Sequence, residues 1–304
     1  MQHLSLVTEE HITTESWVHA VNGSEEAGCI NLTSSNPALD FYIDTVLVGC
    51  LSLFGLIGNL VSFLVLQKTN GKLTSTAVLL QGLAFFDSFF ILGSIFYHSL
   101  RSVYPYTGYM TTYWNNFPLV QVHVLPWWYI SQTCSTWMVT YITVDRYLAV
   151  HHPIKAIIHC SAKRARKMTV VIFLLAVLYN IPRFFEYRVL KLPLHCEVHY
   201  LRYQASLFTN TTYRFMYACC LYFLTMYILP LVILIVCNIQ LIREVHQASR
   251  NRTCMVLSLN MRSHREDGSI SIIVIAVILS FILCIGPDLV LQIMFVTNAS
   301  YSQR

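Results

Sequence analysis

The sequence predicts an all-α membrane protein that folds as a bundle of six spanning helices. Of its 304 residues, 55% are hydrophobic and only 12% are charged, which is about half the charged fraction of a typical soluble domain. A single soluble core could not enclose so much apolar surface. The apolar residues also gather in runs of roughly 20, the length that a helix needs to cross a bilayer.

Six such runs follow one another along the chain. Lipid offers backbone N–H and C=O groups no hydrogen-bond partner, so we expect every run to be a helix. The six predicted spans are residues 43–66, 76–100, 122–144, 168–185, 215–242 and 270–296. No internal repeat separates them, and we expect a single bundle.

Basic residues in the loops orient this bundle. The connections after the first, third and fifth spans carry most of the Lys and Arg residues, and such short basic loops stay in the cytoplasm. We therefore expect a plasma-membrane protein with an extracellular tail over residues 1–42, a bundle over 43–296 and a short external remnant over 297–304. The sequence places external glycosylation motifs, Asn-x-Ser/Thr, at Asn22, Asn31, Asn210 and Asn298.

The most specific signal stands at the inner end of the third span. Asp145, Arg146 and Tyr147 close this apolar run, and His152 and Pro153 follow. Ionisable groups at the membrane edge are costly and need partners. Asp145 either pairs with the adjacent Arg146 and holds it back from the cytoplasm, or forms only an ordinary interfacial salt pair with it.

With these residues in place, the chain resembles the rhodopsin-like G-protein-coupled receptors over residues 43–296. Further family marks follow in the expected order at Gly58-Asn59, Asp87, Asn238 and Cys284. The resemblance implies a helical bundle that binds an extracellular ligand, signals to a heterotrimeric G protein and catalyses no reaction. It assigns G-protein coupling and the switch to Asp145, Arg146, Tyr147, Asp267, Pro230, Phe281 and Pro287.

Two cytoplasmic features can each be interpreted in two ways. Asp267 either locks to Arg146 in the resting state, as the resemblance implies, or caps the start of a helix. The basic inner loops either report topology alone or also form the surface on which the G protein docks.

Asp87 is an acid in the middle of a span, where a bare carboxylate costs at least ~2.5 kcal/mol. The resemblance implies a sodium ion held by Asp87 and by Ser135, which stands eleven residues before Arg146. The alternative is that Asp87 bonds to Asn59 and water. We expect no other cofactor.

A shorter resemblance concerns the ligand. Ile181-Pro182-Arg183-Phe184-Phe185-Glu186 is similar to a segment of the invertebrate FMRFamide-type neuropeptide receptors, which implies a small amidated peptide with a basic residue near its end. Such a cation needs an acid, and we expect Asp288 to supply it. The predicted ligand contacts are Asp288, Gln132, Tyr129, Trp128, Glu186 and Gln292. The aromatic residues among them either stack on the ligand or only pack within the bundle and its interfacial belt.

Two departures from the family pattern bear on function. Gln121 stands where the family has the cysteine of a conserved outer disulfide, so Cys196 lacks its usual partner; we expect it to bond to Cys29, the other predicted external cysteine. After Val296 only eight residues follow, so the seventh span is missing. We expect a fragment or splice form of a signalling receptor, or else a truncated non-signalling relative that acts as a decoy or a dominant-negative partner.

Other classes of protein have less support. The net charge of +5 is too small and too dispersed for nucleic-acid binding. Transporters tend to show internal repeats and several buried charges, whereas Asp87 is the only acid deep in a predicted span; a transporter or channel subunit is the weaker alternative. Neither a Gly-x-Ser-x-Gly nor a His-Glu-x-x-His motif occurs, and these are signatures of hydrolases.

Overall fold

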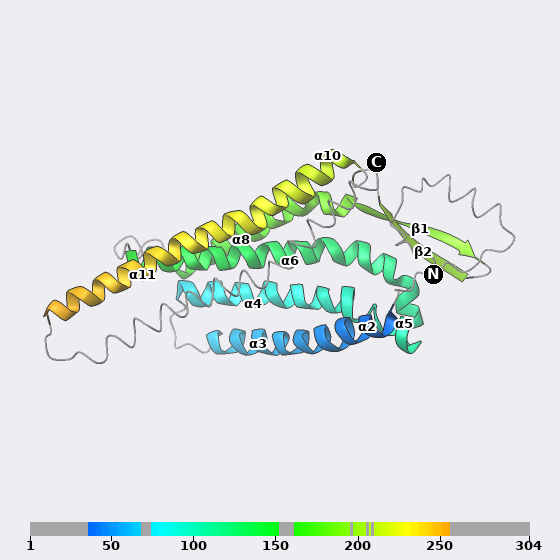
Figure 1. The fold of residues 1–304 in the computed structure, drawn as a ribbon, viewed down its shortest axis with the longest axis horizontal. Coiled ribbons are helices and arrows are strands. Elements are labelled where there is room, and N and C mark those ends of the chain that lie inside the picture. Colours follow the sequence, from blue (N-terminus) through cyan, green and yellow to red (C-terminus); the bar gives the residue numbers. More distant parts are fainter. Residues whose placement is uncertain are drawn as a thin grey trace, which may run out of the picture.

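The computed structural model describes residues 36–67, 74–151, 161–194, 197–204, 207 and 210–255. In this part of the chain, four helical stretches are long and apolar enough to cross a membrane. They are Pro37–Gln67, Ser75–Thr107, Ala162–Phe185 and Leu224–Glu244. These helices run alongside one another in an elongated bundle (Figure 1). The predicted fold class, an all-α helical membrane bundle, is confirmed.

The first span lies at the edge of the described bundle. It joins α2 (Pro37–Asp40), the π-helical segment η1 (Phe41–Val48) and α3 (Gly49–Gln67). Large apolar side chains on α3 are exposed, with Phe54 at 74%. Exposed apolar surfaces of this kind mark a contact with a membrane or with other protein, and the length and hydropathy of this span suit lipid.

The second span packs between α3 and the rest of the bundle. It consists of α4 (Ser75–Ser94) and the π-helical turn η2 (Ile95–Ser99). Thr74 caps its first turn, because the Thr74 hydroxyl accepts a hydrogen bond from the Ala77 N–H, an N-cap arrangement typical of Thr. The short helix α5 (Val103–Thr107) follows.

The third helix, α6 (Thr111–His151), is the central element of the bundle. It contacts α4, α8 and α11, and several of its polar residues, among them Ser131, Thr133 and Thr140, are buried against protein rather than facing lipid. Residues 122–144, predicted as the third span, are helical throughout. The core that α6 forms with α4 and α8 contains Leu79, Ile130, Cys134, Met138, Ala165 and Ala176.

The fourth span, α8 (Ala162–Asn180), ends in the 3-10 turn η3 (Ile181–Phe185). A two-stranded antiparallel hairpin follows, with β1 (Tyr187–Leu194) paired to β2 (Glu197–Gln204). It projects from the end of the bundle (Figure 1). The sequence analysis did not predict this hairpin.

The fifth span begins with α10 (Thr211–Tyr213) and continues through η4 (Arg214–Leu221) and η5 (Leu224–Ile228), both π-helical. It then runs on as α11 (Leu229–Met255), which extends past the neighbouring helices (Figure 1). Asn210 caps α10, because its side-chain oxygen accepts hydrogen bonds from the Thr212 and Tyr213 N–H groups.

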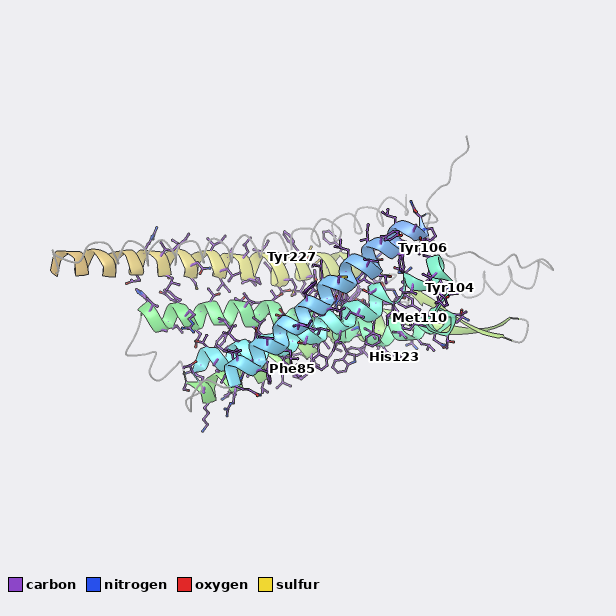
Figure 2. All side chains as sticks on the ribbon, turned by 90° about the horizontal axis from the view of Figure 1, so that it is seen from below. Phe85, Tyr104, Tyr106, Met110, His123 and Tyr227 are labelled. Carbon is purple, nitrogen blue, oxygen red and sulfur yellow. The ribbon has the colours of Figure 1, made fainter. Side chains whose placement is uncertain are left out.

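Following the loop charges, we call the end that carries α5 and the hairpin the outer end, and the end that carries Asp145 the inner end. Tyr104, Tyr106 and Met110 lie together at the outer end, while Phe85 lies toward the inner end (Figure 2). The Tyr106 ring stacks on Phe41 with 4.8 Å between centroids. Aromatic residues typically gather at the level of the lipid headgroups.

Several predicted features lie outside the described residues. They are the sixth span (270–296), the remnant 297–304, most of the tail 1–42, and the residues Cys29, Cys196, Asp267, Phe281, Pro287, Asp288, Gln292, Asn22, Asn31 and Asn298. The Cys29–Cys196 bond, these three glycosylation sites and the division into domains therefore stay predictions. Asn210, the fourth predicted glycosylation site, is exposed.

Candidate functional site

The inner end of α6 is fixed to α4 through a buried carboxylate. Asp145 is 5% exposed, and the Ser75 hydroxyl donates a hydrogen bond to Asp145 Oδ1 at 3.0 Å. Ser75 opens α4, so the bond joins the inner ends of two spans. The next residue, Arg146, is exposed.

A second contact at the inner end joins α6 to α11. The Tyr147 ring stacks on His151 with 5.2 Å between centroids. His151 Nδ1 lies 2.8 Å from Glu244 Oε1.

Pro230, predicted as part of the switch, is fully buried near the start of α11, directly after η5. Pro cannot donate a backbone hydrogen bond, and helices often kink next to it.

Asp87 and Ser135, the predicted sodium ligands, lie in contact in the middle of the bundle. The Ser135 hydroxyl donates to Asp87 Oδ1 at 2.5 Å. Asp87 also lines a cavity of about 330 Å³ together with Asn59 and Ser62. Carboxylate, hydroxyl and amide oxygens are the ligands that hard cations prefer, so the residues present fit a sodium ion.

No group of three or more His, Cys, Asp or Glu side chains in the described part of the chain could hold a metal ion. A cation at Asp87 would thus depend on hydroxyl and amide oxygens besides the one carboxylate.

The outer half of α6 holds a hydrogen bond at the position of the missing cysteine. Gln121 is 5% exposed, and its side-chain N–H donates to the Tyr97 hydroxyl at 2.8 Å. This bond joins α6 to η2 at the outer end of the second span. A buried hydrogen bond here links α6 to the second span, whereas the family's cysteine would link α6 to the outer loop.

Trp128, a predicted ligand residue, packs between the second and third spans. Its ring stacks on Phe90 and Tyr97, with centroid distances of 5.3 and 5.8 Å. It also fills the space above Gly93, where an added Cβ would lie 2.8 Å from Trp128 Cδ1. The indole N–H is buried without a hydrogen-bond partner.

Tyr129, Gln132 and Glu186, three further predicted ligand residues, gather around a buried arginine. Arg183 Cζ lies 3.9 Å above the Tyr129 ring centroid, and Arg183 Nη1 lies 3.6 Å from Glu186 Oε2. The Tyr222 hydroxyl donates to Gln132 Oε1 at 3.1 Å. We call Arg183, Glu186, Tyr129, Tyr217 and Tyr222 the arginine cluster.

The fifth span closes this cluster. Tyr217 and Tyr222 place their rings 5.5 and 5.4 Å from Arg183 Cζ, distances within the range of cation–π attraction. The Tyr213 hydroxyl donates to Glu186 Oε1 at 2.9 Å. The cluster therefore joins α6, η3 and the fifth span.

The sequence analysis missed the roles of Arg183, Tyr213, Tyr217 and Tyr222. Arg183 stands three residues before Glu186 at the end of an apolar run, a spacing at which helical side chains of opposite charge meet. That pair could have been read from the sequence. No such signal in the sequence singled out the three tyrosines, because they stand among many other aromatic residues at the start of the fifth span.

Comparisons with known proteins give a family and relatives. Residues 58–304 match the family described as the 7 transmembrane receptor (rhodopsin family). The chain is 33% identical to the FMRFamide receptor of Drosophila melanogaster over 88% of its own length and 48% of that receptor. It is 32% identical to the FMRFamide peptide receptor frpr-18 of Caenorhabditis elegans, over 45% of the chain and 31% of that receptor.

The sex peptide receptor of Drosophila melanogaster is 26% identical, over 80% of the chain and 58% of that receptor. The chain thus spans about half the length of the FMRFamide receptor of Drosophila melanogaster, with which it aligns over 88% of its own residues.

Proposed function

Because the chain belongs to the rhodopsin family of seven-transmembrane receptors, we propose that it binds a small neuropeptide outside the cell and signals to a heterotrimeric G protein. The observation that carries the proposal is the 33% identity to an FMRFamide receptor over 88% of the chain. A second FMRFamide receptor is similar at 32% identity. We therefore propose an FMRFamide-like peptide as the ligand and the plasma membrane, with the N-terminus outside, as the location.

The geometry of α6 supports this proposal. Its outer half carries Tyr129 and Gln132, which contact residues of the fourth and fifth spans. Its inner end carries Asp145, held by Ser75, beside the exposed Arg146. One continuous helix thus joins the proposed ligand site to the proposed G-protein site, and it can transmit a rearrangement at one end to the other.

We also propose that Asp87 and Ser135 hold a sodium ion between these two ends. The cavity beside Asp87, whose lining includes the polar side chains of Asn59 and Ser62, and the hydrogen bond from Ser135 support this. When bound, the ion would supply positive charge against the carboxylate. Asp87 itself would orient the ion, and the Ser135 hydroxyl would keep the carboxylate on the α6 side of the cavity.

The test is a binding and signalling assay on membranes of cells that express the chain. The probe is the synthetic peptide Phe-Met-Arg-Phe-amide, as named in the relatives. We expect saturable binding and dissociation of the G protein on addition of the peptide. Arg146→Ala should abolish dissociation and leave binding intact. Absence of peptide binding would overturn the proposal, and binding without G-protein dissociation would favour the non-signalling alternative.

A further inference from the structure

The arginine cluster is a buried ion pair at the outer end of the fourth span. Arg183 is 5% exposed and Glu186 is 1% exposed. Their closest atoms, Nη1 and Oε2, are 3.6 Å apart, which is an ionic contact but longer than a hydrogen bond. Arg183 lies in η3, which contacts β1 of the hairpin.

Three polar atoms of this pair are buried without a hydrogen-bond partner. They are Arg183 Nε, Arg183 Nη2 and Glu186 Oε2. Buried polar groups in folded proteins are nearly always hydrogen-bonded, so such a set needs an explanation. The unmatched atoms comprise N–H donors from the guanidinium and one carboxylate acceptor, all within one cluster.

We propose that the arginine cluster binds the C-terminal carboxamide of an amidated peptide. A carboxamide carries a carbonyl oxygen that accepts hydrogen bonds and an NH₂ group that donates them. Its oxygen matches the donors of Arg183, and its NH₂ group matches Oε2 of Glu186. This inference rests on the proposed peptide-receptor function and names the part of the peptide that this site takes.

Charge separates the carboxamide from other ligand groups. The charges of Arg183 and Glu186 cancel, so the cluster has no net charge to attract an ion. A free C-terminal carboxylate would be repelled by Glu186 and has no N–H to give to Oε2. A ligand guanidinium would meet the charge of Arg183. A neutral group with both a donor and an acceptor is the chemistry that fits.

Entry of the carboxamide requires one aromatic ring to move. Side chains of Tyr129, Tyr217 and Tyr222 face the guanidinium. The Tyr217 ring is the farthest of the three from Arg183 Cζ, at 5.5 Å, and its hydroxyl donates to the Tyr179 carbonyl oxygen of the fourth span at 2.7 Å. A conformation in which one of these rings has moved aside would be a minor one in the free receptor, and a ligand that binds it makes it the dominant one.

The test compares Phe-Met-Arg-Phe-amide with the same peptide as a free acid, in competition binding to membranes that carry the chain. We expect the amide to bind at least about tenfold more tightly, since a site built to hydrogen-bond a group rejects the analogue that lacks it. If both forms bind with equal affinity, the peptide function stands and the carboxamide site is overturned. If neither binds, the proposed function and this inference are both overturned.

Two variants separate a binding role from a structural one. Arg183→Lys keeps the charge but loses Nε and the planar fork, and we expect about a tenfold weaker affinity for the amide, the equivalent of one charged hydrogen bond. Glu186→Gln removes the charge that repels the acid, so the preference for the amide should fall to within roughly threefold. If Arg183 and Glu186 had only a structural role, each variant would lower the affinities for the amide and the acid equally and leave the ratio of the two affinities unchanged.

The matched control is Arg188→Lys. Arg188 is exposed and lies in β1, two residues after Glu186. It should leave the affinities for both peptides as they are in the original chain. The ratio of amide to acid affinity does not depend on how much receptor reaches the membrane, so a variant with reduced expression still gives a decisive result.

Discussion

At the scale of single residues, Asp145 shows how a motif read from the sequence acquires a partner that the sequence does not reveal. Its carboxylate accepts a hydrogen bond from Ser75, 70 positions away in the chain. The sequence suggested Arg146 as the partner because it is adjacent. The Ser75 bond follows from the packing of α4 against α6, and it fixes the carboxylate while Arg146 faces outward.

Replacing Ser75 with Ala should destabilise the receptor. The change removes a donor to a buried carboxylate, a loss of about 1.5–3 kcal/mol. We expect the midpoint of thermal unfolding in detergent to fall by roughly 3–6 °C, measured with a thiol-reactive dye.

Ser88→Ala is the matched control for this prediction. The Ser88 hydroxyl donates only to the Ala84 carbonyl oxygen of its own helix, so its loss should change stability by less than about 0.5 kcal/mol. An equal fall in both variants would show that the bond to Asp145 carries no special weight.

Asp87→Asn should remove the effect of sodium on peptide binding. The variant keeps the size of the side chain but loses the charge that a cation needs. Peptide affinity of the original chain should differ between buffers containing sodium chloride and N-methylglucamine chloride at equal ionic strength, while the variant should show one affinity. Asp44→Asn at the outer end is the control, and persistent sodium sensitivity in D87N would exclude Asp87 as a ligand.

The family resemblance implied that Asp87 and Ser135 lie close together, and the two side chains are hydrogen-bonded in the structure. The arginine cluster could not be found in this way. Its members come from α6, η3 and the fifth span, up to 93 positions apart (Tyr129 to Tyr222). Which faces of three helices meet depends on their rotation and on the π-helical turns of the fifth span, which periodicity does not predict.

At the scale of helices, the close contact of α4 with α6 depends on a glycine, which has no side chain. Gly93 lies against Trp128, and an added Cβ would come within 2.8 Å of the indole. Gly93→Ala should therefore push α4 and α6 apart and destabilise the receptor by about 1–3 kcal/mol, seen as a lower thermal midpoint.

Gly58→Ala tests the opposite case in the same kind of helix. An added Cβ at Gly58 meets nothing within 4 Å, and Ala favours a helix over Gly by roughly 1 kcal/mol. We expect this variant to be as stable as the original chain or slightly more so. If both substitutions lowered the midpoint alike, backbone effects rather than the Trp128 contact would be responsible.

Helix extents differ from the prediction for physical reasons. The third span was predicted as residues 122–144, but α6 runs from Thr111 to His151. Hydropathy marks only the part of a helix that suits lipid, whereas a helix continues wherever its backbone bonds are made. Pro118 and Pro126 are accommodated inside α6, although Pro usually kinks or ends a helix.

At the scale of the whole molecule, α6 connects every part of the proposed mechanism. It contacts the second, fourth and fifth spans and carries residues of the arginine cluster, the Asp87 site and the inner end. The fold class was predictable because composition and run length alone require a helical bundle in lipid. The relation between its two ends was not, because it depends on contacts between helices that lie far apart in the sequence.

The last prediction concerns the inner ends of α6 and α11, on the premise of the proposed G-protein coupling. His151 and Glu244 join them, with both side chains about one-third exposed, and a pair of this kind contributes at most about 1 kcal/mol. If a G protein enters beside Arg146, these ends must separate. Glu244→Gln should therefore raise ligand-independent G-protein dissociation by up to about fivefold.

His151→Phe should give the same increase, because it keeps an aromatic ring against Tyr147 but loses the bond to Glu244. Since both changes break one contact, the double variant should exceed neither single variant by a measurable amount; additive effects would mean that the two residues act separately. Basal signalling that stays unchanged in all three would show that the ends of α6 and α11 do not hold the resting state. The contact would then be a surface ion pair without a part in the switch.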